Sequence, residues 1–281
     1  MFTVRFPPQP AREADGELVA VEFGDGRVDE LRIHDYERVY AVPGLYEEIV
    51  HHRLGCRTPG RMAQLLAGAA ARIGWAPGDV RILDVGAGNG VSGEAFAALG
   101  MRPVVGLDIL PAARDAALRD RPGVYGGYLA ADLCALSAEE ERIVRDARPN
   151  ALACVGSVGG DHLPPAAVAA ALELLAPDAL VAYAYDVALP EDPMGTLFGF
   201  ASESWFAWQA SGLVPRRSPS VSGFACQASA LVPRRSPSAT LLARERALHR
   251  RTVTGGERHW EVVVVHLAQA AVRVLPDSGS G

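Results

Sequence analysis

The alternation of short apolar runs with helix-like segments from residue 80 onward restricts the fold more than any other feature of the sequence. The apolar runs are residues 80–85, 103–107, 125–130, 151–155 and 179–185. Several contain almost no polar residue, as strands covered by helices on both faces should. Between them, helices are expected at 91–99, from Ser137 and at 164–175. This repeated order predicts an α/β fold with a parallel, doubly wound sheet.

The two ends of the chain have a different pattern. Two β-prone runs, 18–23 and 27–33, flank Gly24-Asp25-Gly26, which is typical of a hairpin. Residues 36–75 have a helical pattern with expected breaks at Pro43-Gly44 and around Pro59-Gly60. Residues 241–253 and 259–267 predict an antiparallel hairpin that closes the sheet. We therefore expect an N-terminal extension and helical cap at 1–75, a main domain at 76–270 and a tail at 271–281.

A tandem repeat interrupts the main domain. Residues 204–220 and 222–238 match at 14 of 17 positions, and both end in Leu-Val-Pro-Arg-Arg-Ser-Pro-Ser. Two copies cannot form a solenoid, which needs at least three repeats. The preferred interpretation is a duplicated surface loop, because added loop length costs little closure entropy. The alternative is a functional clamp of arginines, formed by Arg216, Arg217, Arg234 and Arg235.

Composition excludes some classes of protein and weakens others. The net charge of -6 argues against a nucleic-acid-binding surface, which usually has a basic excess. No apolar run approaches the roughly 18 residues of a membrane span, and the first residues lack the pattern of a signal peptide. The four cysteines form no Cys-x-x-Cys pair. We therefore expect a cytoplasmic protein with no membrane partner; its oligomeric state stays open.

The strongest chemical signal is the glycine-rich turn at residues 82–90, Ile-Leu-Asp-Val-Gly-Ala-Gly-Asn-Gly. Glycines between a buried strand and a helix let the backbone pass close to a bound nucleotide. The dinucleotide fingerprint G-x-G-x-x-G does not fit, because its last glycine would fall at Val91. Asp84 would also repel a pyrophosphate, which binds at the positive end of a helix. S-adenosylmethionine, with its sulfonium and ammonium, suits that carboxylate better than NAD.

Two further aspartates follow the next two predicted strands. Asp108 ends the second strand, where an acid can accept hydrogen bonds from both ribose hydroxyls. Asp132 follows the third strand, where a carboxylate could accept from an adenine amino group. The carboxyl ends of parallel strands form the edge at which doubly wound sheets bind ligands. Together with Asp84, these residues predict a binding site for an adenosine-containing cation.

Residues 80–186 resemble the core of a class I S-adenosylmethionine-dependent methyltransferase, and the resemblance extends more loosely to about residue 267. Pro43 to Glu47 resembles a segment of stand-alone bacterial members. The resemblance implies a Rossmann-like, mostly parallel seven-stranded sheet whose last strand is antiparallel. It also implies a set of cofactor-binding residues: Asp84, Gly86, Ala87, Gly88, Asp108, Ile109, Asp132, Leu133, Gly156, Tyr40 and Tyr46.

The sequence departs from the family pattern at the fourth strand. Many members carry an acidic residue or asparagine there, whereas this chain has Ala-Leu-Ala-Cys-Val-Gly-Ser at residues 151–157. The Asn-Pro-Pro-Tyr type motif of amino-directed nucleic-acid methyltransferases is therefore missing. This weakens the case for a nucleic-acid acceptor.

Candidate catalytic residues follow the fourth strand. His162 titrates near neutral pH and could take a proton, with Asp161 beside it. Alternatively, Asp161 caps the next helix and His162 is an exposed loop residue. For His51-His52 we expect no metal site, because no spaced third ligand is visible. Trp205, Phe206 and Trp208 suit either an apolar pocket or a core helix.

The resulting functional hypothesis is methyl transfer from S-adenosylmethionine to oxygen, nitrogen or carbon of a small organic molecule. One alternative is an RNA or protein methyltransferase that uses the nine arginines between residues 216 and 258. A second is a non-catalytic protein that only binds the cofactor. An NAD-dependent oxidoreductase is disfavoured by Asp84 and Val91.

Overall fold

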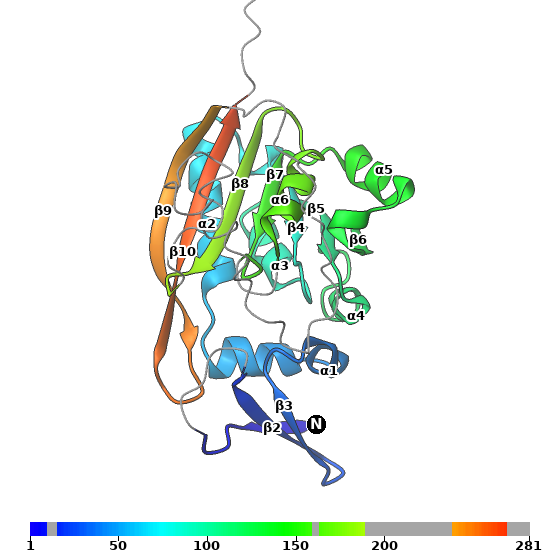
Figure 1. The fold of residues 1–281 in the computed structure, drawn as a ribbon, viewed down its shortest axis with the longest axis vertical. Helices are drawn as coiled ribbons and strands as arrows, with labels where there is room; N and C mark the ends of the chain where they lie inside the picture. Colours follow the sequence, from blue (N-terminus) through cyan, green and yellow to red (C-terminus); the bar gives the residue numbers. More distant parts are fainter. Residues whose placement is uncertain (10–15, 159–162, 189–237, 269–281) are drawn as a thin grey trace, which may run out of the picture.

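The computed structural model describes residues 1–9, 16–158, 163–188 and 238–268. Its largest element is a seven-stranded sheet with the order β6-β5-β4-β7-β8-β10-β9 (Figure 1). The strands are β4 (Arg81–Val85), β5 (Arg102–Asp108), β6 (Gly127–Ala130), β7 (Ala151–Cys154), β8 (Ala179–Asp186), β9 (Ser238–Arg251) and β10 (Glu257–Ala268). Strands β4 to β8 pair in parallel, and β10 is antiparallel to both of its neighbours. The predicted fold class is confirmed.

Helices cover both faces of this sheet. Helices α2 (Thr58–Arg72) and α3 (Val91–Ala98) pack on one face, and α5 (Ala138–Ala147) and α6 (Pro165–Leu172) on the other. Because both faces are covered, β7 and β8 are buried almost throughout, which explains their unbroken apolar sequence. Helix α2 is 15 residues long. No helix in the described part of the chain is long and apolar enough to cross a membrane.

The helical segment before the large sheet is divided differently from the prediction. The break at Pro43-Gly44 is confirmed, because it separates α1 (Tyr36–Ala41) from the π-helix η2 (Glu47–Arg53). The second break lies at residues 54–57, slightly before the position expected around Pro59-Gly60. Pro59 lies in the first turn of α2, where a missing N–H breaks no helical hydrogen bond. Helix α2 packs on the large sheet, although it lies within residues 1–75.

A small second sheet precedes these helices. The predicted hairpin is confirmed as β2 (Leu18–Phe23) and β3 (Val28–Arg32), and an additional strand, β1 (Phe2–Arg5), pairs with β2. The apolar faces of this sheet, α1 and η2 share one core. We call α1 and η2 together the cap. The cap lies across the edge of the large sheet where its parallel strands end (Figure 1).

The N-terminal part is attached to β9 by a buried ion pair and by backbone hydrogen bonds. Glu17 and Arg250, with side chains 1% and 4% exposed, meet at 2.5 Å. The second carboxylate oxygen of Glu17 accepts from the backbone N–H of Val253 at 2.9 Å. The N–H of Arg251 donates to the carbonyl of Leu54 at 2.7 Å. These contacts hold the cap over the large sheet.

Candidate functional site

Asp84, in β4, is fully buried beneath the glycine turn. Its Oδ2 accepts hydrogen bonds from Ser92 Oγ at 2.5 Å and from Tyr125 Oη at 2.7 Å. Its Oδ1 has no partner among the described residues. Burial raises the pKa of this carboxyl to about 6, against the opposing effect of the two hydrogen bonds. A cation delivered to Oδ1 would favour the ionised form.

The Tyr125 side chain passes close to two glycines on its way to Asp84. A Cβ atom on Gly93 of α3 would lie 2.6 Å from the Tyr125 ring, and one on Gly106 of β5 would lie 3.0 Å from it. Sequence reasoning did not identify Tyr125 as a site residue. The available signal was an isolated glycine inside a helix and another inside a strand, since such glycines often mark a close approach.

The glycine turn has backbone angles that residues other than glycine rarely adopt. Gly86, Gly88 and Gly90 have φ values of +69°, +53° and +88°. The N–H groups of Gly86 and Ala87 donate to the carbonyl of Leu107 at 2.8 and 3.1 Å, which fixes the turn against β5. A Cβ atom on Gly88 would lie 2.6 Å from Tyr40 Oη. The turn therefore runs directly beneath a tyrosine of the cap.

Asp108 lies at the end of β5, next to the glycine turn. Its Oδ2 accepts from the backbone N–H of Gly88 at 3.0 Å, and its Oδ1 from that of Leu110 at 3.0 Å. Asp108 thus supports the glycine turn at the edge where the parallel strands end.

The third aspartate and its neighbours lie at the end of β6. Asp132 Oδ1 accepts from the N–H of Cys134 at 2.9 Å and caps the short helix η4 (Leu133–Ala135). Leu133 is buried in the core of the large domain, whereas Ile109 is half-buried after β5. Ala131 donates from its N–H to the carbonyl of Asp108 at 2.9 Å, so the ends of β5 and β6 lie side by side.

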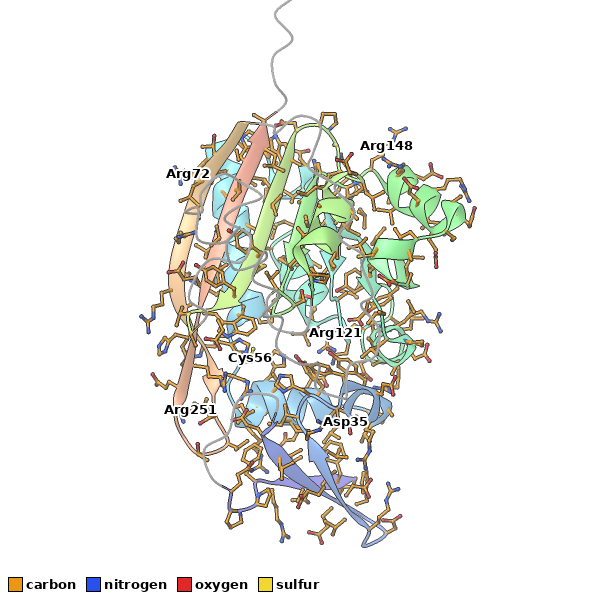
Figure 2. All side chains as sticks on the ribbon, viewed as in Figure 1. Asp35, Cys56, Arg72, Arg121, Arg148 and Arg251 are labelled. Atoms are coloured by element: carbon orange, nitrogen blue, oxygen red, sulfur yellow. The ribbon has the colours of Figure 1, made fainter. Side chains whose placement is uncertain are left out.

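The cap contacts the glycine turn through a polar cluster and tyrosines. Glu47 Oε1 accepts from Asn89 Nδ2 at 2.7 Å and from Arg121 Nη1 at 2.6 Å. Arg121 also donates to the carbonyl of Asn89 at 3.1 Å, and Figure 2 shows it between the large sheet and the cap. The rings of Tyr40 and Tyr46 are 5.2 Å apart. Sequence reasoning identified both tyrosines but missed Glu47 and Arg121 as a pair, because they are 74 residues apart.

At the end of β7 the backbone again needs a glycine. Gly156 has a φ of +78°, and a Cβ atom there would lie 3.2 Å from the indole of Trp260. The next residue, Ser157, donates from Oγ to the carbonyl of Val85 at 3.0 Å, and its Cβ would lie 2.6 Å from a Cβ on Gly86. The structure therefore brings Gly156, the glycine turn and the start of β10 to one edge of the sheet.

Several predicted residues lie outside the described part of the chain. These are Asp161 and His162, residues 204–237 of the tandem repeat with their tryptophans and arginines, and the tail at 271–281. Where the structure does describe the chain, no group of three His, Cys, Asp or Glu side chains is placed to hold a metal ion.

No protein-family model matches the chain, and no curated protein matches its sequence. Among solved structures, an amino pentose methyltransferase from Micromonospora echinaspora with bound S-adenosylmethionine is 26% identical, with a TM-score of 0.39. That match covers 50% of this chain and 55% of the other, so it spans little more than half of that protein.

Two other similar structures cover more of the chain at lower identity. The 1,6-didemethyltoxoflavin-N1-methyltransferase of Burkholderia thailandensis, with bound S-adenosylhomocysteine, is 16% identical over 92% of this chain and 98% of that one, with a TM-score of 0.44. A TehB-like S-adenosylmethionine-dependent methyltransferase from Corynebacterium glutamicum is 17% identical over 74% and 87%, with a TM-score of 0.40.

Proposed function

We propose that this protein transfers a methyl group from S-adenosylmethionine to a small organic molecule. The observation that supports this most is Asp84, a buried carboxyl with one oxygen that lacks a partner among the described residues. A buried ionised group is stable only when it is paired, so this oxygen calls for a cationic or proton-donating ligand. The ammonium of a methionine group meets that need, and a pyrophosphate does not.

The rest of the cofactor would lie along the carboxyl edge of the sheet. Asp108 would bind the ribose and Asp132 the adenine, with Ile109 and Leu133 on either side. The methionine end would lie against residues 86–88 of the turn, Gly156, and Tyr40 and Tyr46 of the cap. Bound there, S-adenosylmethionine supplies a methyl group on a sulfonium, which is already activated. The protein then has to hold the acceptor in line at near-attack distance and exclude water.

The cap favours a small acceptor over a macromolecule. It lies across the edge where the cofactor would bind, and it is fixed by the Glu47–Arg121 pair and by the buried Glu17–Arg250 pair. A base is needed only if the acceptor arrives protonated. The sequence nominates His162, with Asp161 beside it, for that role, and this remains a prediction.

Calorimetric titration with S-adenosylmethionine, S-adenosylhomocysteine and NAD tests the proposal. We expect both sulfur ligands to bind and NAD not to. Asp108→Asn should weaken binding by about 10- to 100-fold, because roughly 1.5–3 kcal/mol is lost with hydrogen bonds to a charged group. Asp115→Asn, a change at an exposed aspartate of α4 (Pro111–Asp120), is the matched control and should bind normally. Binding of NAD alone would overturn the proposal.

A further inference from the structure

A chain of polar contacts runs from the cap to the start of β10. His51 Nδ1, in η2, lies 3.3 Å from the backbone carbonyl of Cys56. The Cys56 sulfur lies 3.7 Å from His249 Nδ1, which is also 2.8 Å from Thr58 Oγ1. The His249 ring stacks on Trp260 with centroids 3.8 Å apart. Cys56 marks this junction between the cap and the β9–β10 hairpin in Figure 2.

The contact with the Cys56 carbonyl determines which ring nitrogen of His51 carries the proton. A carbonyl oxygen can only accept, so Nδ1 must carry the hydrogen and Nε2 keeps its lone pair. Nε2 is buried and has no partner among the described residues. Burial lowers the pKa of His51 from its ordinary value, which keeps the ring neutral at physiological pH. His51 therefore has an oriented ring and a vacant basic nitrogen.

His51 lies on the side of the cap that meets the glycine turn. Glu47 is four residues earlier in η2, so the two share a face, and Glu47 bonds the turn at Asn89. A row of aromatic rings leads in the same direction. Tyr46 is 5.7 Å from His51 between ring centroids and 5.2 Å from Tyr40, whose hydroxyl lies over Gly88.

Two vacant donors belong to the same junction. Trp260 Nε1 and Arg258 Nε are buried and have no hydrogen-bond partner in the part of the chain that the structure describes. They are two residues apart in β10 and so point to the same side of the strand. Arg258 is held by Asp186 through Nη1, at 3.2 Å. A ligand with an anionic or carbonyl oxygen would satisfy these donors.

The electrostatic surroundings of His51 come from several parts of the chain. Glu47 and His52 of η2 and Arg121 after α4 act directly on His51. The junction also contains Tyr46, Cys56 and His34, and His249, Arg250 and Arg258 of the β9–β10 hairpin. Each arginine is paired with an acid: Arg121 with Glu47, Arg250 with Glu17, and Arg258 with Asp186. Burial, rather than an excess of positive charge, is therefore the main cause that disfavours protonated His51.

We propose that His51 Nε2 is the general base of the transfer and that the acceptor is a flat aromatic hydroxyl compound bearing a carboxylate or carbonyl. This rests on the proposed function. The O–H bond breaks, its proton moves to Nε2, and the electron pair stays on oxygen to form the new O–CH₃ bond. The pair of the broken methyl–sulfur bond stays on sulfur, and imidazolium His51 then releases its proton to water.

The test begins with histidine ring ¹⁵N spectra of the protein saturated with S-adenosylhomocysteine, which identify His51 by its loss in His51→Gln. At pH 7.5 we expect His51 Nε2 to be unprotonated. Addition of 4-hydroxybenzoate or salicylate should shift that nitrogen, whereas 4-methoxybenzoate, which has no phenolic proton to give, should shift it far less. A protonated Nε2, or no shift with either phenol, overturns the proposal.

Transfer of labelled methyl from S-adenosylmethionine to the phenols adds a kinetic readout. His51→Gln should lower kcat by about 10²-fold or more while leaving S-adenosylhomocysteine affinity unchanged. In the wild type, kcat should fall as the pH decreases through the pKa of His51, below about 6.5. His52→Gln is the matched control: this neighbour is 70% exposed, pairs with Glu48 and should behave as wild type.

The rival base gives the opposite pattern. If His162→Gln abolishes transfer and His51→Gln does not, His51 is not the base. If the wild type fails to bind S-adenosylhomocysteine, the proposed function has failed rather than the assignment of His51. A phenol-induced shift of His51 Nε2 in the wild type, together with unchanged cofactor affinity and lost transfer in His51→Gln, supports the assignment of His51 as the base.

Discussion

Asp84 makes the stability of the protein depend on pH. Its folded pKa of about 6 lies above the ordinary 3.8, so ionisation opposes folding by roughly 3 kcal/mol. The protonated carboxyl contributes stability that is complete below about pH 4 and is lost as pH rises through 6. Asp84→Asn lacks this titration. Its unfolding free energy should therefore gain about 3 kcal/mol relative to wild type between pH 4 and pH 7, measured by denaturant unfolding.

The titration of Asp84 should also change the affinity for the cofactor. A cationic ligand favours ionised Asp84, so the affinity for S-adenosylmethionine should fall below pH 6 in the wild type. Ser92→Ala, which removes one hydrogen bond to the carboxylate but keeps the carboxyl, is the matched variant and should retain the pH dependence. A stability difference between Asp84→Asn and wild type that does not change with pH contradicts the assignment.

Gly88 gives a prediction about close packing between the cap and the turn. Gly88→Ala places a Cβ 2.6 Å from Tyr40 Oη at a φ of +53°, so the backbone strain alone costs about 1–2 kcal/mol. We expect weaker binding of S-adenosylhomocysteine and a lower melting temperature. Adding Tyr40→Phe removes the hydroxyl and should recover part of the loss.

The control for the Gly88 variants places an alanine where no atom lies close to the added Cβ. A Cβ on Gly60, in α2, meets no atom within 4 Å, so Gly60→Ala should be neutral or stabilise the helix by up to about 1 kcal/mol. Equal effects of the two alanines would show that the contact with Tyr40 is unimportant.

At the scale of elements, the sequence predicted the strands and helix starts that depend on local patterns of residues. The parallel strands were predicted because burial on both faces leaves an apolar run, and Ser137 was identified as a helix start by its capping box with Glu140. The break before α2 was expected a few residues too late, because Pro59 can either end a helix or occupy its first turn. Tyr125 was missed because its role depends on glycines in two other elements. Such a contact leaves only single glycines in the sequence, and these do not identify the side chain that approaches them.

The attachment of the N-terminal sheet provides a prediction at this scale. Glu17→Gln leaves Arg250 buried without its charge partner, which typically costs 3–5 kcal/mol. We expect a loss of that size in denaturant unfolding, together with weaker cofactor binding because the cap is no longer held. Glu22→Gln breaks the exposed pair with Arg5 and should cost about 1 kcal/mol or less. A small effect of Glu17→Gln would mean that the N-terminal sheet is held by its apolar core instead.

At the scale of the whole molecule, the tandem repeat should be dispensable for folding. Residues 204–237 of the repeat lie between β8 and β9 in the chain, and its last residue, Ser238, begins β9. Removing one 18-residue unit, 204–221, changes the loop-closure free energy by less than about 1 kcal/mol. The melting temperature and the affinity for S-adenosylhomocysteine should both be unchanged. A deletion that folds but no longer binds would instead support the arginine clamp.

The position of β10 has a consequence for biosynthesis. This strand comes last among the described elements, yet it lies inside the sheet, between β8 and β9. While the chain leaves the ribosome, β8 can pair with β7 on one side only, and its other edge stays open until residues 257–268 emerge. An apolar strand with an open edge recruits other strands. The nascent protein therefore keeps an exposed apolar strand edge on β8 until β10 has been made.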